Sequence, residues 1–197
     1  GGWTFLMREI TAFPMENLIH SLSISVLSLF YLMGDGLFKA ISTQAANLIG
    51  QHKLNHFNTL LRSSFIIYTI IMFFLYIPLI LMPDPLIGFF IKYTYDSTVL
   101  YQAHLALFGV WCYLFIDGIA WIFGSFLRAG GDTVTVLIIN VACSWGLGLV
   151  PAMYLIHFHN VHVSFLWMYV FTSYGICNSL FMGLRYFSKK WIKLDLS

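Results

Sequence analysis

Five long apolar runs constrain the fold of this chain more than any other feature of its sequence. They extend approximately over residues 18–48, 63–82, 99–127, 134–156 and 163–184. Each has roughly the 20 residues that a helix rising about 1.5 Å per residue needs to cross ~30 Å of hydrocarbon. A barrel of membrane strands would instead show alternating segments of about ten residues, which the sequence lacks. The runs therefore predict an all-α membrane protein.

The composition agrees with a lipid bilayer as the surrounding medium. Only 9% of the residues are charged and 59% are hydrophobic, whereas a soluble domain usually carries about 25% charged residues. The net charge of +2 gives no reason to expect a nucleic-acid partner. No catalytic motif such as G-x-S-x-G, H-E-x-x-H or a P-loop is present, so we do not expect an enzyme.

The distribution of basic residues predicts the orientation of the helices. The C-terminal tail contains Arg185, Lys189 and Lys190, and Arg128 follows the third run, whereas segment 157–162 has no Lys or Arg. Basic residues favour the cytoplasmic side of a membrane. We therefore expect an integral protein of the cytoplasmic or plasma membrane, with its C-terminus and the 128–132 loop inside and segment 157–162 outside.

The chain shows no linker and no low-complexity tract, so residues 1–197 are expected to form a single transmembrane domain. The apolar opening, residues 1–13, is shorter than a span and predicts a truncated N-terminal helix. The expected fold is thus a bundle of five full transmembrane helices plus this truncated helix. A truncated helix also predicts that the chain is a fragment of a longer protein.

Asp117 is an isolated carboxylate in the middle of the third run. A charged side chain at the bilayer centre costs about 2.5–3.5 kcal/mol and usually faces a cavity or a partner. Burial favours the neutral form of a carboxyl group, which suits uptake and release of protons. An ionised carboxylate would instead offer oxygen to a sodium ion, and a structural acid would form a hydrogen bond to a neighbouring helix. Tyr113 lies four residues earlier, on the same helical face, so its hydroxyl is expected at the same cavity.

Asp35 and Lys39 form a second polar pair at i, i+4 spacing, with the acid first, which is the favourable order for an ion pair. Lys39 has the alternative of extending toward the cytoplasmic face. Gln44 and Asn47 follow in the same run, so this helix is expected to face water or protein rather than lipid. These four residues could either line a cavity or make contacts between helices, and the sequence leaves both alternatives open.

Three histidines, His157, His159 and His162, stand close together, as metal ligands often do. No carboxylate or cysteine accompanies them in this short segment at the membrane edge. We therefore expect no bound metal here.

Two stretches resemble the multidrug and toxic compound extrusion (MATE) family. GLFKAISTQAANLIGQ, residues 36–51, is similar to the family pattern Gly-Leu-x-x-Ala-x-Ser-Thr followed by Val-Gly-Gln-x-x-Gly, although Ala45, Ala46 and Asn47 replace the Val-Gly-Gln. FLRAGGDT, residues 126–133, is similar to Ala-Leu-Arg-Gly-x-Gly-Asp-Thr. The residues that match are Gly36, Ala40, Ser42, Thr43, Gly50, Leu127, Arg128, Gly131, Asp132 and Thr133.

The resemblance covers nearly the whole chain and implies the second of two six-helix lobes, from the end of the seventh helix to the twelfth. It places Arg128, Gly131 and Asp132 in a motif loop. The family's acidic residue in the tenth helix, eleven positions before the loop arginine, corresponds to Asp117, and a tyrosine of some members corresponds to Tyr113. The family exports cationic or amphipathic small molecules in exchange for H⁺ or Na⁺, so no cofactor is expected beyond that coupling ion.

A lone second lobe implies a partner, because the N-terminal lobe would supply the facing half of the cavity, in cis or in trans. Two other functions remain open. One is a lipid-linked oligosaccharide flippase of the same superfamily, whose cavity should be richer in arginine than these spans are. The other is a membrane protein that no longer transports.

Overall fold

The computed structural model describes residues 14–90, 97–159 and 161–191, and within them all regular secondary structure is helical. The all-α prediction is confirmed. The elements are α2 (Pro14–Gly50), η1 (Leu54–His56), α3 (Phe57–Tyr76), η2 (Ile77–Leu81), α4 (Pro83–Phe90), α5 (Ser97–Ala129), α6 (Thr133–Cys143), η3 (Ser144–Leu149), α7 (Val150–His159), α8 (Val163–Phe165), η4 (Leu166–Phe171) and α9 (Thr172–Phe187). The predicted truncated N-terminal helix lies outside the described residues.

Several of these elements join into longer helices. Pro78 lies in the π-helical turn η2, and Pro151 follows the π-helical turn η3, which contains two glycines. Proline has no N–H to donate to the preceding turn, so it loosens the hydrogen-bond ladder without ending the helix. Leu54–Leu81 and Thr133–His159 are therefore continuous helices, and both, like the single helix Ser97–Ala129, have enough residues to cross a bilayer.

Four helices in the described part are long and apolar enough to span a membrane: Glu16–Gly50 and the three just named. The fifth predicted run is also helical without a break, through α8, η4 and α9. It is not among the four, because polar residues such as Asn178 and Ser179 interrupt its apolar character. The predicted spans otherwise agree with the structure, except that α3 begins at Phe57 rather than near residue 63.

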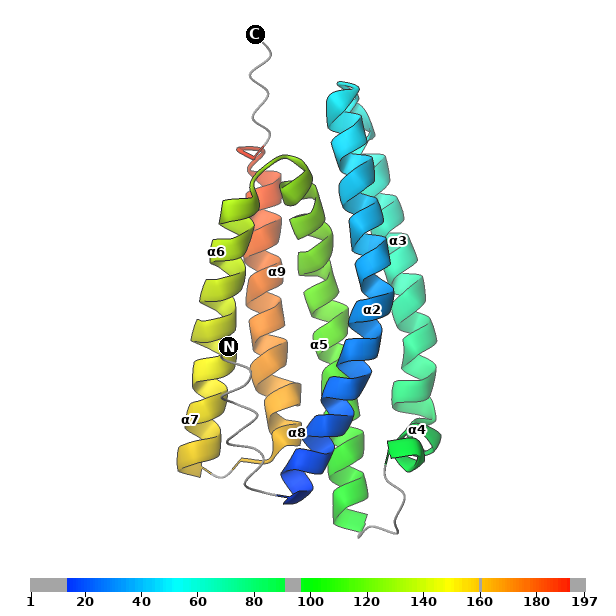
Figure 1. Cartoon of the computed structure of the whole chain (residues 1–197), viewed down its shortest axis with the longest axis vertical. Helices are drawn as coiled ribbons and strands as arrows, with labels where there is room; N and C mark the ends of the chain where they lie inside the picture. The colour runs from blue at the N-terminus through cyan, green and yellow to red at the C-terminus, as the bar shows by residue number, and fades with distance from the viewer. Residues whose placement is uncertain (1–13, 91–96, 160, 192–197) are drawn as a thin grey trace.

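The helices run up and down, so their connections alternate between two ends (Figure 1). The α2–α3 connection, the α5–α6 connection and the end of α9 lie at one end, and the start of α2 and the α7–α8 connection lie at the other. The end with the α2–α3 and α5–α6 connections is the one predicted to be cytoplasmic, and that orientation stays a prediction. Glu16 ties the second end together, since its carboxylate is 2.5 Å from Nδ1 of His162 and accepts a 2.8 Å bond from the Val163 N–H.

Helix α5 is the centre of the bundle. It packs against α2, α3, α9 and η4, and most residues of its second half are buried. A helix in this position is covered by neighbouring helices on most sides, so its polar side chains must find partners on those helices.

Candidate functional site

Asp117 is the centre of the candidate site, at only 1% exposure in the second half of α5. Its Oδ2 accepts a 2.8 Å bond from Nε1 of Trp121 and 3.2 Å bonds from the hydroxyls of Tyr31 and Tyr113. Its Oδ1 accepts a 3.3 Å bond from Nδ2 of Asn178. Tyr113 and Trp121 lie one turn before and after Asp117, so the helical period places all three on one face.

All four donors are uncharged, and no ion pair involves Asp117 in the described part of the chain. The donors come from three helices, since Tyr31 belongs to α2 and Asn178 to α9. Asp117 therefore holds α2, α5 and α9 together through hydrogen bonds to neutral groups. Its negative charge, when present, has no fixed countercharge there.

Further oxygen atoms lie beside this carboxylate. The hydroxyls of Tyr31 and Tyr113 are 3.0 Å apart, and Nδ2 of Asn178 also donates to Oδ1 of Asn140 on α6, at 3.0 Å. Oδ1 of Asn178 is buried and accepts no hydrogen bond from the described residues. Carboxylate and amide oxygens are ligands that hard cations prefer, and a proton would turn the carboxylate into a donor. The arrangement is suited to either a proton or a small hard cation.

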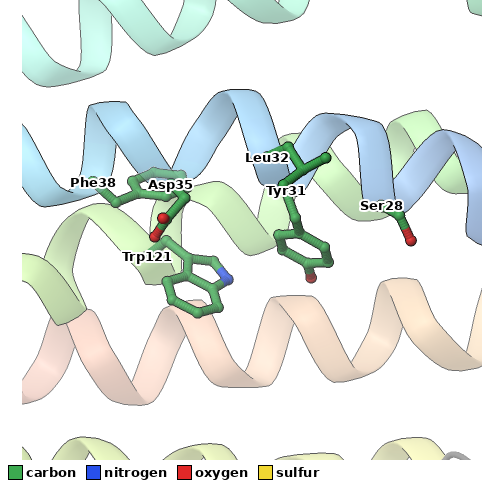
Figure 2. Close-up of a pocket in the computed structure, with 6 residues that line it drawn as sticks. All are labelled: Ser28, Tyr31, Leu32, Asp35, Phe38 and Trp121. Atoms are coloured by element: carbon green, nitrogen blue, oxygen red, sulfur yellow. The ribbon is translucent and has the colours of Figure 1, made fainter.

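A pocket of about 600 Å³ lies next to the carboxylate, between α2 and α5. Its lining residues are Ser28, Tyr31, Leu32, Asp35, Phe38 and Trp121 (Figure 2). Two of them, Tyr31 and Trp121, are also donors to Asp117. Two side chains thus connect the buried carboxylate to the pocket, because they bond the carboxylate and also line the pocket.

Only some of the polar residues that were predicted to line a cavity on α2 lie at the pocket. Asp35 lines the pocket, and Nζ of Lys39 is 2.5 Å from its Oδ2. Gln44 and Asn47 are exposed on the same helix and are not part of the pocket lining. A role of these two residues in a cavity stays a prediction.

The motif loop joins α5 to α6 and is tied to α9. Gly131 has φ +84°, a left-handed conformation that glycine adopts without strain. Asp132 accepts a 2.6 Å bond from Oγ1 of Thr135 and forms a 2.6 Å ion pair with Nε of Arg185. The loop thereby fixes the start of α6 against the end of α9.

Arg128 links this loop to the site. Its Nη2 donates to Oγ of Ser125 at 3.2 Å, and its guanidinium carbon lies 5.4 Å from the ring centre of Trp121, within cation–π range. Trp121 in turn donates to Asp117. The predicted site residues Asp117 and Tyr113 are thus in direct contact, whereas Arg128 of the motif loop lies one side chain away from Asp117, with Trp121 between them.

Sequence reasoning missed Tyr31, Trp121, Asn140 and Asn178. Trp121 had a usable signal, because it lies four residues after Asp117 on the same helix. Asn178 also had one, as an amide inside an otherwise apolar run. Asn140 had the same signal within the apolar run 134–156, but nothing local distinguishes Tyr31, whose proximity to Asp117 depends on how α2 packs.

Among the residues that the structure describes, no three histidine, cysteine or acidic side chains lie together in a way that could hold a metal ion. Of the three histidines near residue 160, His162 pairs with the carboxylate of Glu16.

Comparison with protein-family models matches residues 19–154 to the model described as MatE. This match includes Asp117, the pocket-lining residues and both motif stretches; it ends within α7, before Asn178. Comparison with curated proteins and with solved structures returned no match.

Proposed function

Since the chain belongs to the MATE family, whose members are membrane transporters rather than enzymes, we propose that it is part of a secondary active exporter. In this proposal it exports cationic or amphipathic small molecules in exchange for H⁺ or Na⁺. Asp117 binds the coupling cation, and the Tyr113 hydroxyl orients that cation. The chain is an integral membrane protein, by its family and by its four apolar helices of spanning length.

The observation that supports this proposal is the set of partners of Asp117. A buried carboxylate beside Arg or Lys would already be neutralised, but Trp121, Asn178 and the two tyrosines donate without bringing charge. An uncompensated charge inside a membrane is costly. Binding a proton or a sodium ion restores neutrality, so uptake of a cation by the carboxylate lowers the free energy.

Exchange additionally requires that cation binding and substrate binding oppose each other. Tyr31 and Trp121 supply the contact for this, because they both donate to Asp117 and line the adjacent pocket. A cation at Asp117 competes with the two donors for the same oxygen and so changes the pocket wall. Rocking of the helices around this midplane site gives alternating access.

We propose that a second lobe, in the same polypeptide or in another chain, completes the cavity on the open side of the pocket. The tail after α9 and the motif loop lie in the cytoplasm in this proposal. The basic residues at that end of the bundle support this orientation.

The deciding experiment is Asp117→Asn. Asparagine retains the size and part of the hydrogen bonding but cannot carry the charge, so ion-driven efflux by the complete transporter should fall to background. The helix should insert at least as well, because the cost of placing a charge in the membrane is removed. Tyr113→Phe should reduce efflux less, since a hydroxyl orients a cation without neutralising it.

Asp84→Asn is the matched control, because Asp84 has an 81% exposed side chain in α4 and pairs with His104 instead. Efflux should be measured at equal protein levels, with imposed H⁺ and Na⁺ gradients in separate trials to identify the ion. Near-normal efflux by Asp117→Asn under both gradients would reduce Asp117 to a packing residue.

A further inference from the structure

The pocket is lined by a carboxylate, that of Asp35, which forms an ion pair with Lys39 of the same helix. Asp35 lines the pocket, and the ammonium of Lys39 lies 2.5 Å from its Oδ2. The side chain of Lys39 is 74% exposed and that of Asp35 is 56% exposed. Among the described lining residues Asp35 is the charged one, so the lining carries one negative charge. Its countercharge is the ammonium of Lys39, which is not a lining residue.

This ion pair is of a kind that exchanges easily. An exposed i, i+4 pair contributes little to stability, because each side chain loses freedom and water competes for both charges. The lysine stem is long and flexible, so its ammonium can extend toward the near end of the helix.

The remaining walls are predominantly aromatic. The rings of Phe38 and Trp121 stack at 5.7 Å and 24°, and the ring of Tyr31 meets Trp121 at 6.1 Å and 61°. Aromatic faces attract both flat rings and cations. The volume of about 600 Å³ falls in the usual range of roughly 300–1,000 Å³ for small-molecule sites. Phe38 is buried and stacks on Trp121, so the aromatic surface available to a ligand comes from Tyr31 and Trp121. This surface and one carboxylate together complement a planar aromatic ligand with a single positive charge.

We propose that Lys39 is a built-in competitor for this site: its ammonium holds Asp35 in the absence of ligand, and a planar aromatic monocation displaces it. This inference rests on the proposed function in taking that ligand to be the exported compound. Asp35 stays neutralised throughout, first by Lys39, then by the ligand and again by Lys39 after release. The returning ammonium also opposes rebinding, which favours departure of the ligand.

The direct test is the reactivity of Lys39 in the unmodified 197-residue chain in lipid nanodiscs. Ethidium serves as a planar cation of permanent charge, and pyrene as an uncharged aromatic probe. Saturating ethidium should raise the acylation rate of Lys39, read by mass spectrometry, by roughly two- to tenfold, because the ammonium leaves its ion pair. Pyrene should not raise it. Lys53, an exposed lysine in the α2–α3 connection, should react equally in all samples. Slower or unchanged acylation of Lys39 with ethidium bound would overturn the proposal, as would absence of ethidium binding both to this chain and to the same chain joined to a first lobe.

Two variants test the competition by affinity. Lys39→Met should tighten ethidium binding by roughly two- to tenfold, and Asp35→Asn should weaken it by about tenfold or more. Pyrene binding should change little in either variant. If Lys39→Met weakens ethidium binding, or if Asp35→Asn leaves it unchanged, Lys39 is not a competitor for Asp35.

These measurements need no ion gradient, so they are separable from antiport at Asp117. Loss of the ethidium effect on Lys39 together with an inactive Asp117→Asn variant would refute the competitor and leave the proposed function intact. Faster acylation of Lys39 with ethidium together with near-normal efflux by Asp117→Asn would refute the antiport role of Asp117 alone.

Discussion

Gly118→Ala should destabilise the contact between α3 and α5, immediately beside Asp117. The Tyr68 ring crosses over Gly118, and its hydroxyl donates to the Leu114 carbonyl. A Cβ at residue 118 would lie 2.6 Å from Cε2 of Tyr68 and would overlap its Cζ and hydroxyl. Ordinary carbon contacts are about 3.5–4.0 Å, so the ring has to retreat by roughly 1.5–2 Å to clear its Cζ and hydroxyl.

The magnitude follows from three opposing effects. Forcing an extra methyl group into a packed interior costs about 1–3 kcal/mol. Breaking the buried hydrogen bond of Tyr68 costs a further 1–3 kcal/mol or so. Replacing glycine by alanine within a helix recovers roughly 0.5–1 kcal/mol. We therefore expect a net loss of about 1–5 kcal/mol, opposite in sign to the preference of an isolated helix.

Thermal unfolding in detergent, followed by far-UV circular dichroism, measures the effect. Gly36→Ala on α2 is the matched control, since no described atom lies within 4 Å of a Cβ there, and it should be neutral or slightly stabilising. Adding Tyr68→Leu to Gly118→Ala should recover part of the loss, because leucine ends before the far edge of the ring. The packing explanation is wrong if Gly118→Ala unfolds at the same temperature as Gly36→Ala.

Three further predictions concern the ends of the bundle and its completeness. Arg185→Met should lower stability by roughly 1–3 kcal/mol because it leaves the largely buried Asp132 without its guanidinium, whereas Lys190→Met, at an exposed position, should not change the unfolding temperature. An impermeant thiol reagent on intact cells should label a cysteine introduced at residue 160 and spare one at residue 53; the reverse result excludes the proposed orientation. The 197-residue chain alone should confer no drug resistance, and joining it to a first lobe should restore export, so that transport by the isolated monomer would contradict the need for a second lobe.

The helices were predictable from the sequence because the bilayer imposes a length on apolar segments. The positions of residues 99–127 and 134–156 agree with α5 and with α6 to α7 within a few residues. The early start of α3 was not predictable from hydropathy, since Asn58 and Arg62 extend the helix beyond its apolar part. The short helix α4 was missed too, because its two prolines indicate a turn but are also tolerated in a first helical turn.

The site was only half visible in the sequence, for a different physical reason. An isolated carboxylate in an apolar run stands out, and residues one turn away share its face, so Asp117 and Tyr113 were identifiable as neighbours. Hydrogen bonds between helices depend on crossing angle and register, which hydropathy does not encode. Tyr31 is 86 positions from Asp117 in the chain and reaches it only because α2 packs along α5.

That packing has a thermodynamic consequence for the two neighbouring sites. Tyr31 and Trp121 cannot move without changing both the hydrogen bonds of Asp117 and the wall of the pocket. In the proposed antiport, a ligand that prefers one arrangement of these side chains must alter the cation affinity of Asp117, and linkage requires the cation to alter ligand affinity by the same factor. Trp121→Phe removes the shorter of the two hydrogen bonds but keeps an aromatic wall. It should therefore reduce the effect of Na⁺ or pH on ethidium affinity more than it reduces ethidium affinity itself. Binding titrations at low and high cation concentration measure both quantities, and an unchanged cation effect in Trp121→Phe would show that the two sites communicate by another route.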